Sequence, residues 1–413
     1  MKAVVFTLGC KVNECESESL ISGLKARGYE VSDKLEYADL YIVNTCAVTL
    51  EAEKKSRQTA SRIKKLNPDA KIIFTGCAAE KNYKAFTDKS SAYLVTGVFN
   101  KNAILTALDK SGVMLSEKNA VYEELPSPVS LKTRAFIKVQ DGCDNFCTYC
   151  IIPHLRGRSR SRNPESVIKE ITSLNPSEAI ITGINLSDYH YGGAGLMYLI
   201  ESLKGVKARI RLGSLEVGVI DDKFLQALSN LNDFAPHFHL SLQSGSNAVL
   251  KKMNRRYTRE EFIEKVNLIR QYFPFAGITT DIIVGFPTET EEDFADTLSL
   301  IDKVKFSDIH PFIFSPREGT PAYKMQDLPF EIKKRRLDKL IEIKKQLKVD
   351  FAKSMQGKIL RFLPEEFKNG YTAGYSENYL RLYVKGDLPA GEIVSAKVKS
   401  PYLDGAVAEI VDK

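Results

Sequence analysis

GCDNFCTYC, residues 142–150, is the stretch of this chain that decides its fold. Its cysteines, Cys143, Cys147 and Cys150, follow the spacing C-x3-C-x2-C. Thiolates this close in sequence can each bind a different iron of one cubane iron–sulfur cluster. No fourth cysteine follows nearby, so the motif predicts a cluster with one iron left open to a small molecule. The alternative is a structural zinc loop, but its fourth ligand is missing and the spacing is poor for zinc.

The motif lies in a long series of strand and helix patterns. The expected strands are residues 134–140, 178–182, 208–213, 237–243, 278–285 and 308–314. Six β/α repeats are too few for a full eight-stranded barrel, so they predict an open or partial (β/α)6 barrel. The cysteine motif then follows the first strand, at the carboxyl end where such barrels bind ligands.

Three further cysteines each follow a strand of a second α/β pattern near the N-terminus. Its expected strands are residues 2–8, 40–45, 71–76 and 92–97, which predicts a doubly wound parallel sheet. Cys10, Cys46 and Cys77 follow the first three of these strands. The carboxyl ends of parallel strands share one edge, so the three thiols should meet there. They are either three buried structural thiols or the ligands of a second cluster.

The bulk composition is that of a globular protein. The chain has 413 residues, enough for two or three domains, with 43% hydrophobic and 27% charged residues. No run of eighteen apolar residues is present, so no membrane span is expected, and the N-terminus is typical of a strand and not of a signal peptide. The seven cysteines are not arranged as a disulfide framework, which favours a cytoplasmic location.

These patterns predict four segments. An N-terminal domain covers residues 1–112, a polar and proline-bearing linker 113–132, the β/α domain 133–357, and a small all-β barrel 358–413. Residues 331–361 contain eleven Lys and Arg against four Asp and Glu, an excess equal to the net charge of +7 of the whole chain. This basic helix is either a solvated face or a surface for a polyanion such as nucleic acid.

The cysteine motif on its loop resembles the radical SAM superfamily. Two sets of three cysteines, one on an α/β domain and one on a partial barrel, resemble the methylthiotransferase branch of that superfamily. Further stretches fit, among them IIPHLRGRSRSRNPE, HLSLQSGSNAVLKKMNRRYT, DIIVGFPTETEEDF and FSPREGTPA. The C-terminal segment resembles the TRAM domain, a small RNA-binding barrel, so the resemblance spans essentially the whole chain.

The resemblance implies two [4Fe–4S] clusters and two molecules of S-adenosylmethionine. Cys143, Cys147 and Cys150 would hold the cluster that binds S-adenosylmethionine and cleaves it reductively to a 5′-deoxyadenosyl radical. Cys10, Cys46 and Cys77 would hold an auxiliary cluster at which sulfur is methylated by the other molecule. An external electron donor and a source of sulfur are implied as partners. Further contacts to S-adenosylmethionine or substrate are expected at the strand ends, from Thr182, Gly183, Asn185, Ser214, Glu216, Gln243, Ser244 and Gly285.

The opening stretch TLGCKVNEC, residues 7–15, indicates which substrate is expected. TLGCKVN is similar to the branch that acts on N6-threonylcarbamoyladenosine 37 of tRNA, at C2 of the adenine. The alternatives are the branches that act on isopentenyladenosine in tRNA or on an aspartate of a ribosomal protein. A non-catalytic iron–sulfur RNA-binding or electron-transfer protein is a further alternative. Cys15 begins the next helix pattern and has no counterpart after the other strands, so we expect it not to be a ligand.

If the substrate is RNA, clustered cations of the protein should contact its phosphates. The expected partner is the anticodon stem-loop of tRNA. Arginine is well suited to phosphate, and two clusters stand out. The candidates are Arg156, Arg158, Arg160 and Arg162 beside the barrel cysteines, and Lys333, Lys334, Arg335 and Arg336 on the basic helix. For the first cluster, pairing with local carboxylates is the alternative.

Overall fold

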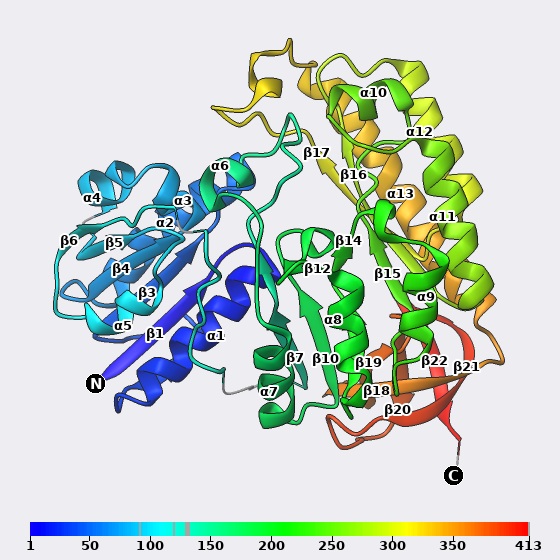
Figure 1. Cartoon of the computed structure of the whole chain (residues 1–413), viewed down its shortest axis with the longest axis horizontal. Coiled ribbons are helices and arrows are strands. Elements are labelled where there is room, and N and C mark those ends of the chain that lie inside the picture. The colour runs from blue at the N-terminus through cyan, green and yellow to red at the C-terminus, as the bar shows by residue number, and fades with distance from the viewer. Residues whose placement is uncertain (91, 119, 129–132, 412–413) are drawn as a thin grey trace.

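The computed structural model describes residues 1–90, 92–118, 120–128 and 133–411. An N-terminal α/β sheet, a central partial barrel and a small C-terminal barrel follow one another along the chain (Figure 1). The α/β fold class with these three parts is therefore confirmed. No helix in the described ranges is both long and apolar enough to cross a membrane.

The N-terminal sheet has six parallel strands in the order β2-β1-β3-β4-β5-β6. The strands are β1 Lys2–Thr7, β2 Glu30–Ser32, β3 Leu40–Thr45, β4 Lys71–Gly76, β5 Leu94–Thr96 and β6 Gly112–Met114. The helices are α1 Lys11–Lys25, α2 Leu50–Leu66, α3 Cys77–Lys81, α4 Lys84–Ser90 and α5 Asn102–Thr106. Apolar residues of α1 and α5 cover one face of the sheet, and those of α2 to α4 cover the other. The strand order reverses between β1 and β3, and ligands bind at such a point in doubly wound sheets.

The sequence patterns missed the two edge strands, β2 and β6, because strands of three residues are too short to show a periodicity. The expected domain boundary at residue 112 falls inside β6, so the sheet extends to Met114. Residues 119 and 129–132 of the expected linker lie outside the described residues.

The central part is an open barrel of parallel strands, in the order β7-β10-β13 and then β14-β15-β16-β17. The strands are β7 Arg134–Lys138, β10 Glu178–Thr182, β13 Arg209–Leu212, β14 Ser214–Leu215, β15 His237–Leu240, β16 Gly277–Val284 and β17 Asp308–Ile313. The longer helices are α7 Pro164–Leu174, α8 Leu196–Ser202, α9 Asp222–Ser229, α10 Asn247–Lys252, α11 Arg259–Tyr272 and α12 Glu291–Val304. Short elements include β8 Gln140–Asp141, β9 Arg160–Ser161, β11 His190–Tyr191, β12 Ala194–Gly195 and α6 Ile152–Arg156. β13 and β14 form one strand position interrupted at Gly213, so six β/α units are present as expected.

The basic helix is α13, Phe330–Ser354, and it leads into a closed five-stranded barrel. The barrel strands are β18 Ile359–Lys368, β19 Tyr371–Ser376, β20 Arg381–Lys385, β21 Val394–Tyr402 and β22 Gly405–Ile410. This barrel contacts the amino end of the central strands, where Arg211 donates to the backbone oxygens of Ser376 and Glu377 at 3.1 and 3.0 Å. The carboxyl ends of the central strands therefore remain available on the opposite side. Residues 412–413 lie outside the described part.

Candidate active site

The N-terminal sheet brings three cysteines to one edge. Cys10 follows β1, Cys46 follows β3 and Cys77 is the first residue of α3, directly after β4. The parallel register aligns the ends of these strands, since Thr45 of β3 pairs with Gly76 of β4. Burial, with smaller contributions from the nearby Cys77 and Cys10, raises the pKa of the Cys46 thiol to about 11. Cys10, Cys46 and Cys77, the N-terminal triad from here on, therefore form one group.

Glycines allow the backbone to approach closely at this edge. Gly9 has φ +111°, and a Cβ there would lie 2.9 Å from the sulfur of Cys46. Gly76 has φ +93°, and a Cβ there would lie 2.6 Å from the backbone oxygen of Thr45. Only glycine fits both the conformation and the space at these two positions.

The barrel triad, Cys143, Cys147 and Cys150, lies on the cluster loop, residues 142–151, after β8. Burial raises the pKa of the Cys143 thiol to about 12 and that of the Cys150 thiol to about 12. Thiolates at neutral pH in such surroundings need positive charge close by, which bound iron provides.

The donor sets of both triads fit iron–sulfur clusters. Among the residues that the structure describes, no three Cys, His, Asp or Glu side chains converge as they would on a single metal ion. Three cysteine thiolates are nevertheless the ligand type that iron–sulfur clusters use. Each triad would leave one iron without a cysteine ligand.

The two triads approach each other at the junction between the domains. Cys77, Ile151, Leu155 and Phe99 share one apolar cluster, and Cys150 packs against it. The charge of Cys77 also contributes to the raised pKa of Cys150. Figure 1 shows α3 and α6 side by side at this junction. A substrate atom placed there would be near both triads.

Hydrogen-bond donors surround the sulfurs of the barrel triad. The side-chain amide of Asn185 lies 3.8 Å from the sulfur of Cys143, and Nη1 of Arg255 donates to the sulfur of Cys147 at 3.2 Å. Glu216 joins them, since it accepts from Arg255 at 2.5 Å and from Asn145 at 3.2 Å. Donors to cluster sulfurs tune the reduction potential, so these residues can act on a bound cluster.

Sequence reasoning missed Arg255 as a neighbour of the barrel triad. Its guanidinium contacts the cysteine loop, Glu216, Tyr257 and the backbone oxygen of Ser241. In the sequence, only its position in the stretch MNRRYT could have drawn attention to it. No local pattern indicates that it contacts a cysteine 108 positions away.

The other expected strand-end residues divide into two groups. Thr182, Gly183, Asn185, Ser214, Glu216 and Gln243 lie at the carboxyl ends of central strands or just after them. Ser244 is fully buried and accepts a hydrogen bond from the backbone of Ser246, and the side chain of Lys333 packs against Gly285. Ser244 and Gly285 are thus covered by the protein itself in this structure, and their contact with a ligand stays a prediction.

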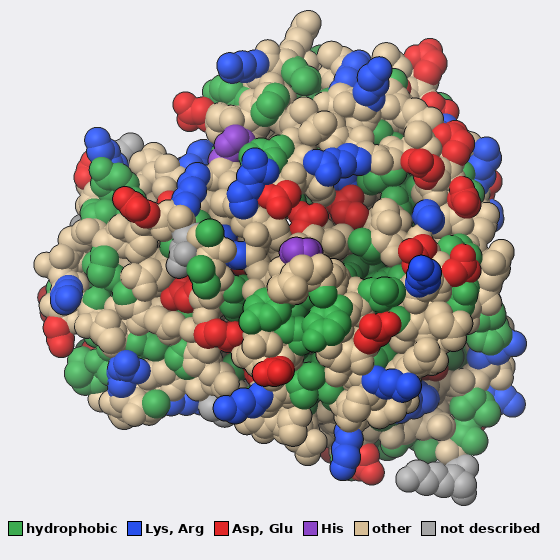
Figure 2. All heavy atoms as spheres, viewed as in Figure 1, with side chains coloured by type: hydrophobic (Ala, Val, Ile, Leu, Met, Phe, Trp, Pro, Cys, Tyr) green, Lys and Arg blue, Asp and Glu red, His purple; other side chains and the backbone are tan. Residues whose placement is uncertain are grey.

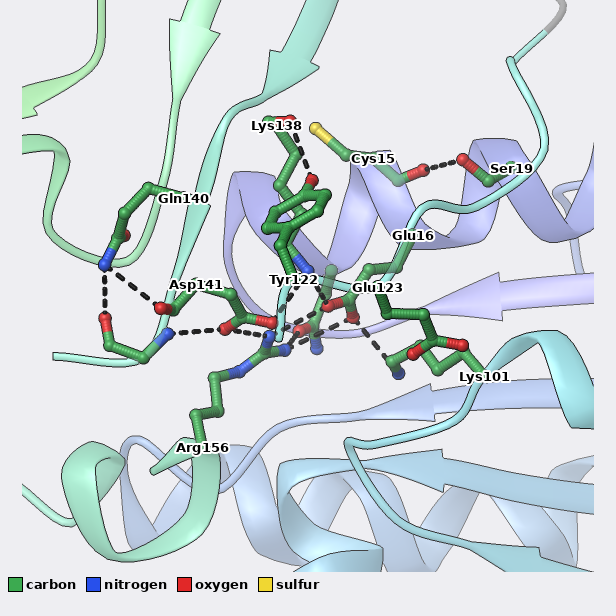
Figure 3. Close-up of polar contacts among 12 residues, drawn as sticks. Cys15, Glu16, Ser19, Lys101, Tyr122, Glu123, Lys138, Gln140, Asp141 and Arg156 are labelled. Atoms are coloured by element: carbon green, nitrogen blue, oxygen red, sulfur yellow. Dashed lines mark hydrogen bonds and ion pairs between the residues drawn. The ribbon is translucent and has the colours of Figure 1, made fainter. Parts of the chain in front are cut away.

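Arg156 lies at the centre of a buried ion network that links the two domains (Figure 3). It is 0% exposed and pairs with Glu16 at 2.8 Å and with Asp141 at 2.9 Å. Lys101 and Lys138 also pair with Glu16, at 3.1 and 2.8 Å. Burial would raise the pKa of Glu16, but the charges of Arg156, Lys101 and Lys138 lower it well below its usual range. Both carboxylates of the network are therefore held ionised, and its cations outnumber them.

The structure corrects five of the eight expected phosphate contacts. Buried guanidinium and ammonium groups that are already paired with carboxylates cannot bind RNA phosphates. The corrected residues and partners are Arg156 with Glu16 and Asp141, Arg160 with Asp141, Arg162 with Glu124 and Glu170, Lys333 with Asp327, and Arg336 with Glu289. Arg158, Lys334 and Arg335 are exposed. Figure 2 shows Lys and Arg side chains mixed with Asp and Glu on the viewed face, with no single positive field.

Comparisons with known proteins agree with this arrangement. Residues 137–301 match the radical SAM superfamily, and residues 2–97 match the uncharacterized protein family UPF0004. The chain is 38% identical to threonylcarbamoyladenosine tRNA methylthiotransferase MtaB of Bacillus subtilis, over 100% of this chain and 98% of that protein. It is 34% identical to a tRNA-2-methylthio-N6-dimethylallyladenosine synthase of Thermoanaerobacter, over 98% of this chain and 92% of that protein. In fold it is similar to the radical S-adenosylmethionine methyltransferase TsrM from Kitasatospora setae, with a TM-score of 0.58 and 13% identity over 90% of this chain and 80% of that one.

Proposed function

The chain belongs to the MtaB-type tRNA methylthiotransferases of the radical SAM family, and on that premise we propose that it methylthiolates C2 of N6-threonylcarbamoyladenosine 37 in tRNA. We propose that it does so with two [4Fe–4S] clusters and two molecules of S-adenosylmethionine. The observation that supports this proposal most directly is the meeting of two cysteine triads at one domain junction. An enzyme that carries sulfur at one cluster and forms a radical at another needs both near the same substrate carbon.

When bound, the clusters and S-adenosylmethionine would supply the electron, the methyl group and the 5′-deoxyadenosyl radical. The C–H bond at C2 of adenine is not acidic enough for a side-chain base, so radical chemistry is the plausible route. The barrel triad would hold the S-adenosylmethionine cluster, and the N-terminal triad the auxiliary cluster. Arg255 and Asn185 would hold the barrel cysteines in place through their donors to sulfur.

We propose that an apolar cluster beside the cluster loop shields the barrel triad from water on one side. Phe286, Phe314, Met253 and Val249 form a buried apolar cluster, and Tyr149 from the cluster loop packs against it. A dry site strengthens the polar contacts that orient the substrate and protects a reactive radical from side reactions.

The proposed partners are the anticodon stem-loop of tRNA, an external electron donor and a source of sulfur, in the cytoplasm. Arg158, Lys334 and Arg335 are the expected cations that remain exposed, and we propose that they contact RNA phosphates. Residues 358–411, the described part of the C-terminal barrel, would add the TRAM-type RNA contact that the resemblance implies.

The substrate is tested by nucleoside mass spectrometry of tRNA from a strain that lacks the gene. We expect threonylcarbamoyladenosine to accumulate without its 2-methylthio form, and the plasmid-borne gene to restore it. Loss of the methylthio group from isopentenyladenosine instead would favour the dimethylallyl branch. About eight irons per chain in anaerobically reconstituted protein supports two clusters, and about four contradicts them.

A further inference from the structure

Lys11 is an exposed cation beside the N-terminal triad. It is the first residue of α1 and directly follows Cys10, the exposed member of that triad. Its ammonium lies 5.8 Å from the centre of the Phe136 ring on β7. None of the residues that the structure describes forms a hydrogen bond or an ion pair with this ammonium. Its positive charge is therefore available to a ligand.

Lys11 faces the interior of the central barrel. α1 lies beside β7, the edge strand of that barrel (Figure 1). Ala135 and Ile137 of β7 belong to the apolar core between the strands and their outer helices, so Phe136, which alternates with them, points to the interior. The ammonium that approaches this ring thus lies at the open edge of the barrel, next to the N-terminal triad.

The charge of Lys11 also acts on groups inside the barrel. Asp281 on β16 is partly exposed there, and its carboxylate contacts Nε2 of His239 at 3.3 Å. Burial would raise the pKa of Asp281, but the hydrogen bond with His239 lowers it, and Lys11 adds to this lowering. Burial lowers the pKa of His237, with a smaller contribution from Lys11. Lys11 is therefore close enough to the interior to act on a charged ligand held there.

Other cations at this junction differ from Lys11, because carboxylates of the protein already pair with them. The pairs are Lys101, Lys138 and Arg156 with Glu16, Arg160 with Asp141, Arg255 with Glu216, and Lys81 and Arg317 with Glu53. Unlike these side chains, Lys11 can offer its full charge to an incoming anion.

The proposed substrate carries an anion that its alternative lacks. In a threonylcarbamoyl group, threonine is linked through its amino nitrogen and keeps its α-carboxylate, which is ionised at neutral pH. A dimethylallyl group is a hydrocarbon with no charge. Lys11 lies in TLGCKVN, the stretch that resembles the threonylcarbamoyl branch and not the other two. A cation in that stretch can therefore distinguish the two substrates.

We propose that Lys11 binds the carboxylate of the substrate's threonyl group and thereby favours threonylcarbamoyladenosine over isopentenyladenosine, an inference that rests on the proposed function. A base held between the two triads lies beside the start of α1, within reach of the flexible lysine side chain. Because Lys11 is exposed in the free protein, the expected gain is that of a partly covered ion pair. The dimethylallyl group gains nothing from this ammonium.

The test compares two synthetic anticodon stem-loops that differ by one charge. Both carry threonylcarbamoyladenosine at position 37, one with the free carboxylate and the other as its methyl ester. Fluorescence anisotropy measures their binding to the anaerobically reconstituted holoenzyme. Wild type should bind the acid about five- to tenfold more tightly than the ester. In Lys11→Gln this ratio should fall to about one, with the affinity for the ester unchanged, and Lys11→Arg should keep most of the ratio.

Lys65→Gln is the matched control. Lys65 is an exposed lysine in the last turn of α2, at the opposite edge of the N-terminal sheet, so its loss should leave the ratio at the wild-type value. Because the ratio compares two probes on one protein, a partial loss of clusters affects both probes alike.

Three outcomes overturn the inference. If Lys11 instead contacts an RNA phosphate, Lys11→Gln weakens the binding of both probes equally and the ratio survives. A ratio of about one in wild type, or an equal loss of the ratio in Lys65→Gln, also contradicts it. A wild-type enzyme that does not methylthiolate the acid probe contradicts the proposed function itself, whatever the ratio.

Discussion

Nε of Arg156 lies 3.3 Å from the sulfur of Cys77, so a barrel-domain arginine contacts a cysteine of the N-terminal domain. The same guanidinium donates to Asn13 at 2.8 Å, and the side chain of Asn13 in turn bonds the backbone oxygen of Thr45, next to Cys46. One buried cation therefore connects the ends of two N-terminal strands to α6, the helix that follows the barrel triad.

Arg156→Ala should destabilise the protein strongly. It would remove the buried hydrogen bonds that the guanidinium gives to Glu16, Asp141 and Asn13, and breaking a buried pair in this way costs about 3–5 kcal/mol. We expect a large fall in the thermal unfolding temperature. The matched control is Arg158→Ala, since Arg158 has a 73% exposed side chain and pairs with Asp144 on the surface, where a pair contributes about 0–1 kcal/mol. Equal effects of the two substitutions would contradict the role of Arg156 as a buried link.

The role of Arg156 illustrates what the sequence could not predict. Four arginines within seven positions were expected to bind phosphate, but the partner Glu16 lies 140 positions earlier in the chain. Local spacing contains no information on such pairing, and an ion-paired core arginine has the same sequence signal as a surface one. Arg317 and Glu53, which are 264 positions apart, are a second example.

Local patterns did predict the parts of the fold that depend on neighbouring residues. The apolar strands and the cysteines that follow them form the parallel edge that the sequence indicated, because strand direction and right-handed crossovers leave few alternatives. The six strand positions of the central barrel were likewise expected.

Cys77→Ser and Cys15→Ser should differ in iron content. Cys77 belongs to the N-terminal triad, so its loss should remove about half of the iron from reconstituted protein. Cys15 lies on α1 and its thiol faces the backbone oxygen of Phe136 at 3.5 Å, so its replacement should leave iron unchanged. Iron and sulfide analysis with electron paramagnetic resonance of the reduced protein provides the measurement. Iron loss in Cys15→Ser would show that this cysteine is a ligand after all.

Glu178 should make folding stability depend on acid pH. It is buried between Arg209 and Arg211, at 2.6 and 2.8 Å. Burial would raise its pKa, but Arg211 and Arg209 lower it to about 2. The stabilisation is thus complete above the unfolded pKa of about 4.3 and decreases as the pH falls toward 2.

Glu178→Gln tests this dependence. At pH 6 the variant should be less stable than wild type by about 3 kcal/mol, from a shift of about two units, and the difference should shrink below pH 4. Urea unfolding at several pH values measures it. Asp222→Asn, at an exposed position of α9, is the control. A difference that stays constant down to pH 3 would disprove the assignment to Glu178.

Exposed and buried cations of α13 should respond differently to substitution. Lys334 and Arg335 are exposed, and Arg335 pairs with the equally exposed Glu291. Replacing both with Ala should weaken tRNA binding and reduce the slope of log affinity against log salt by about one to two, with little effect on thermal stability. Arg336→Ala instead breaks a buried pair with Glu289, and Lys333→Ala removes a buried cation that pairs with the exposed Asp327, so the unfolding temperature should fall, more for Arg336→Ala.

Filter binding at several salt concentrations, beside thermal unfolding of each variant, separates the two effects. Lys110→Ala, on the exposed loop before β6, is the matched control for loss of one surface charge. If the slope of log affinity against log salt is unchanged in the Lys334→Ala, Arg335→Ala double variant, this face of α13 is a solvated surface that does not contact RNA. RNA contact would then have to come from Arg158 or from the C-terminal barrel.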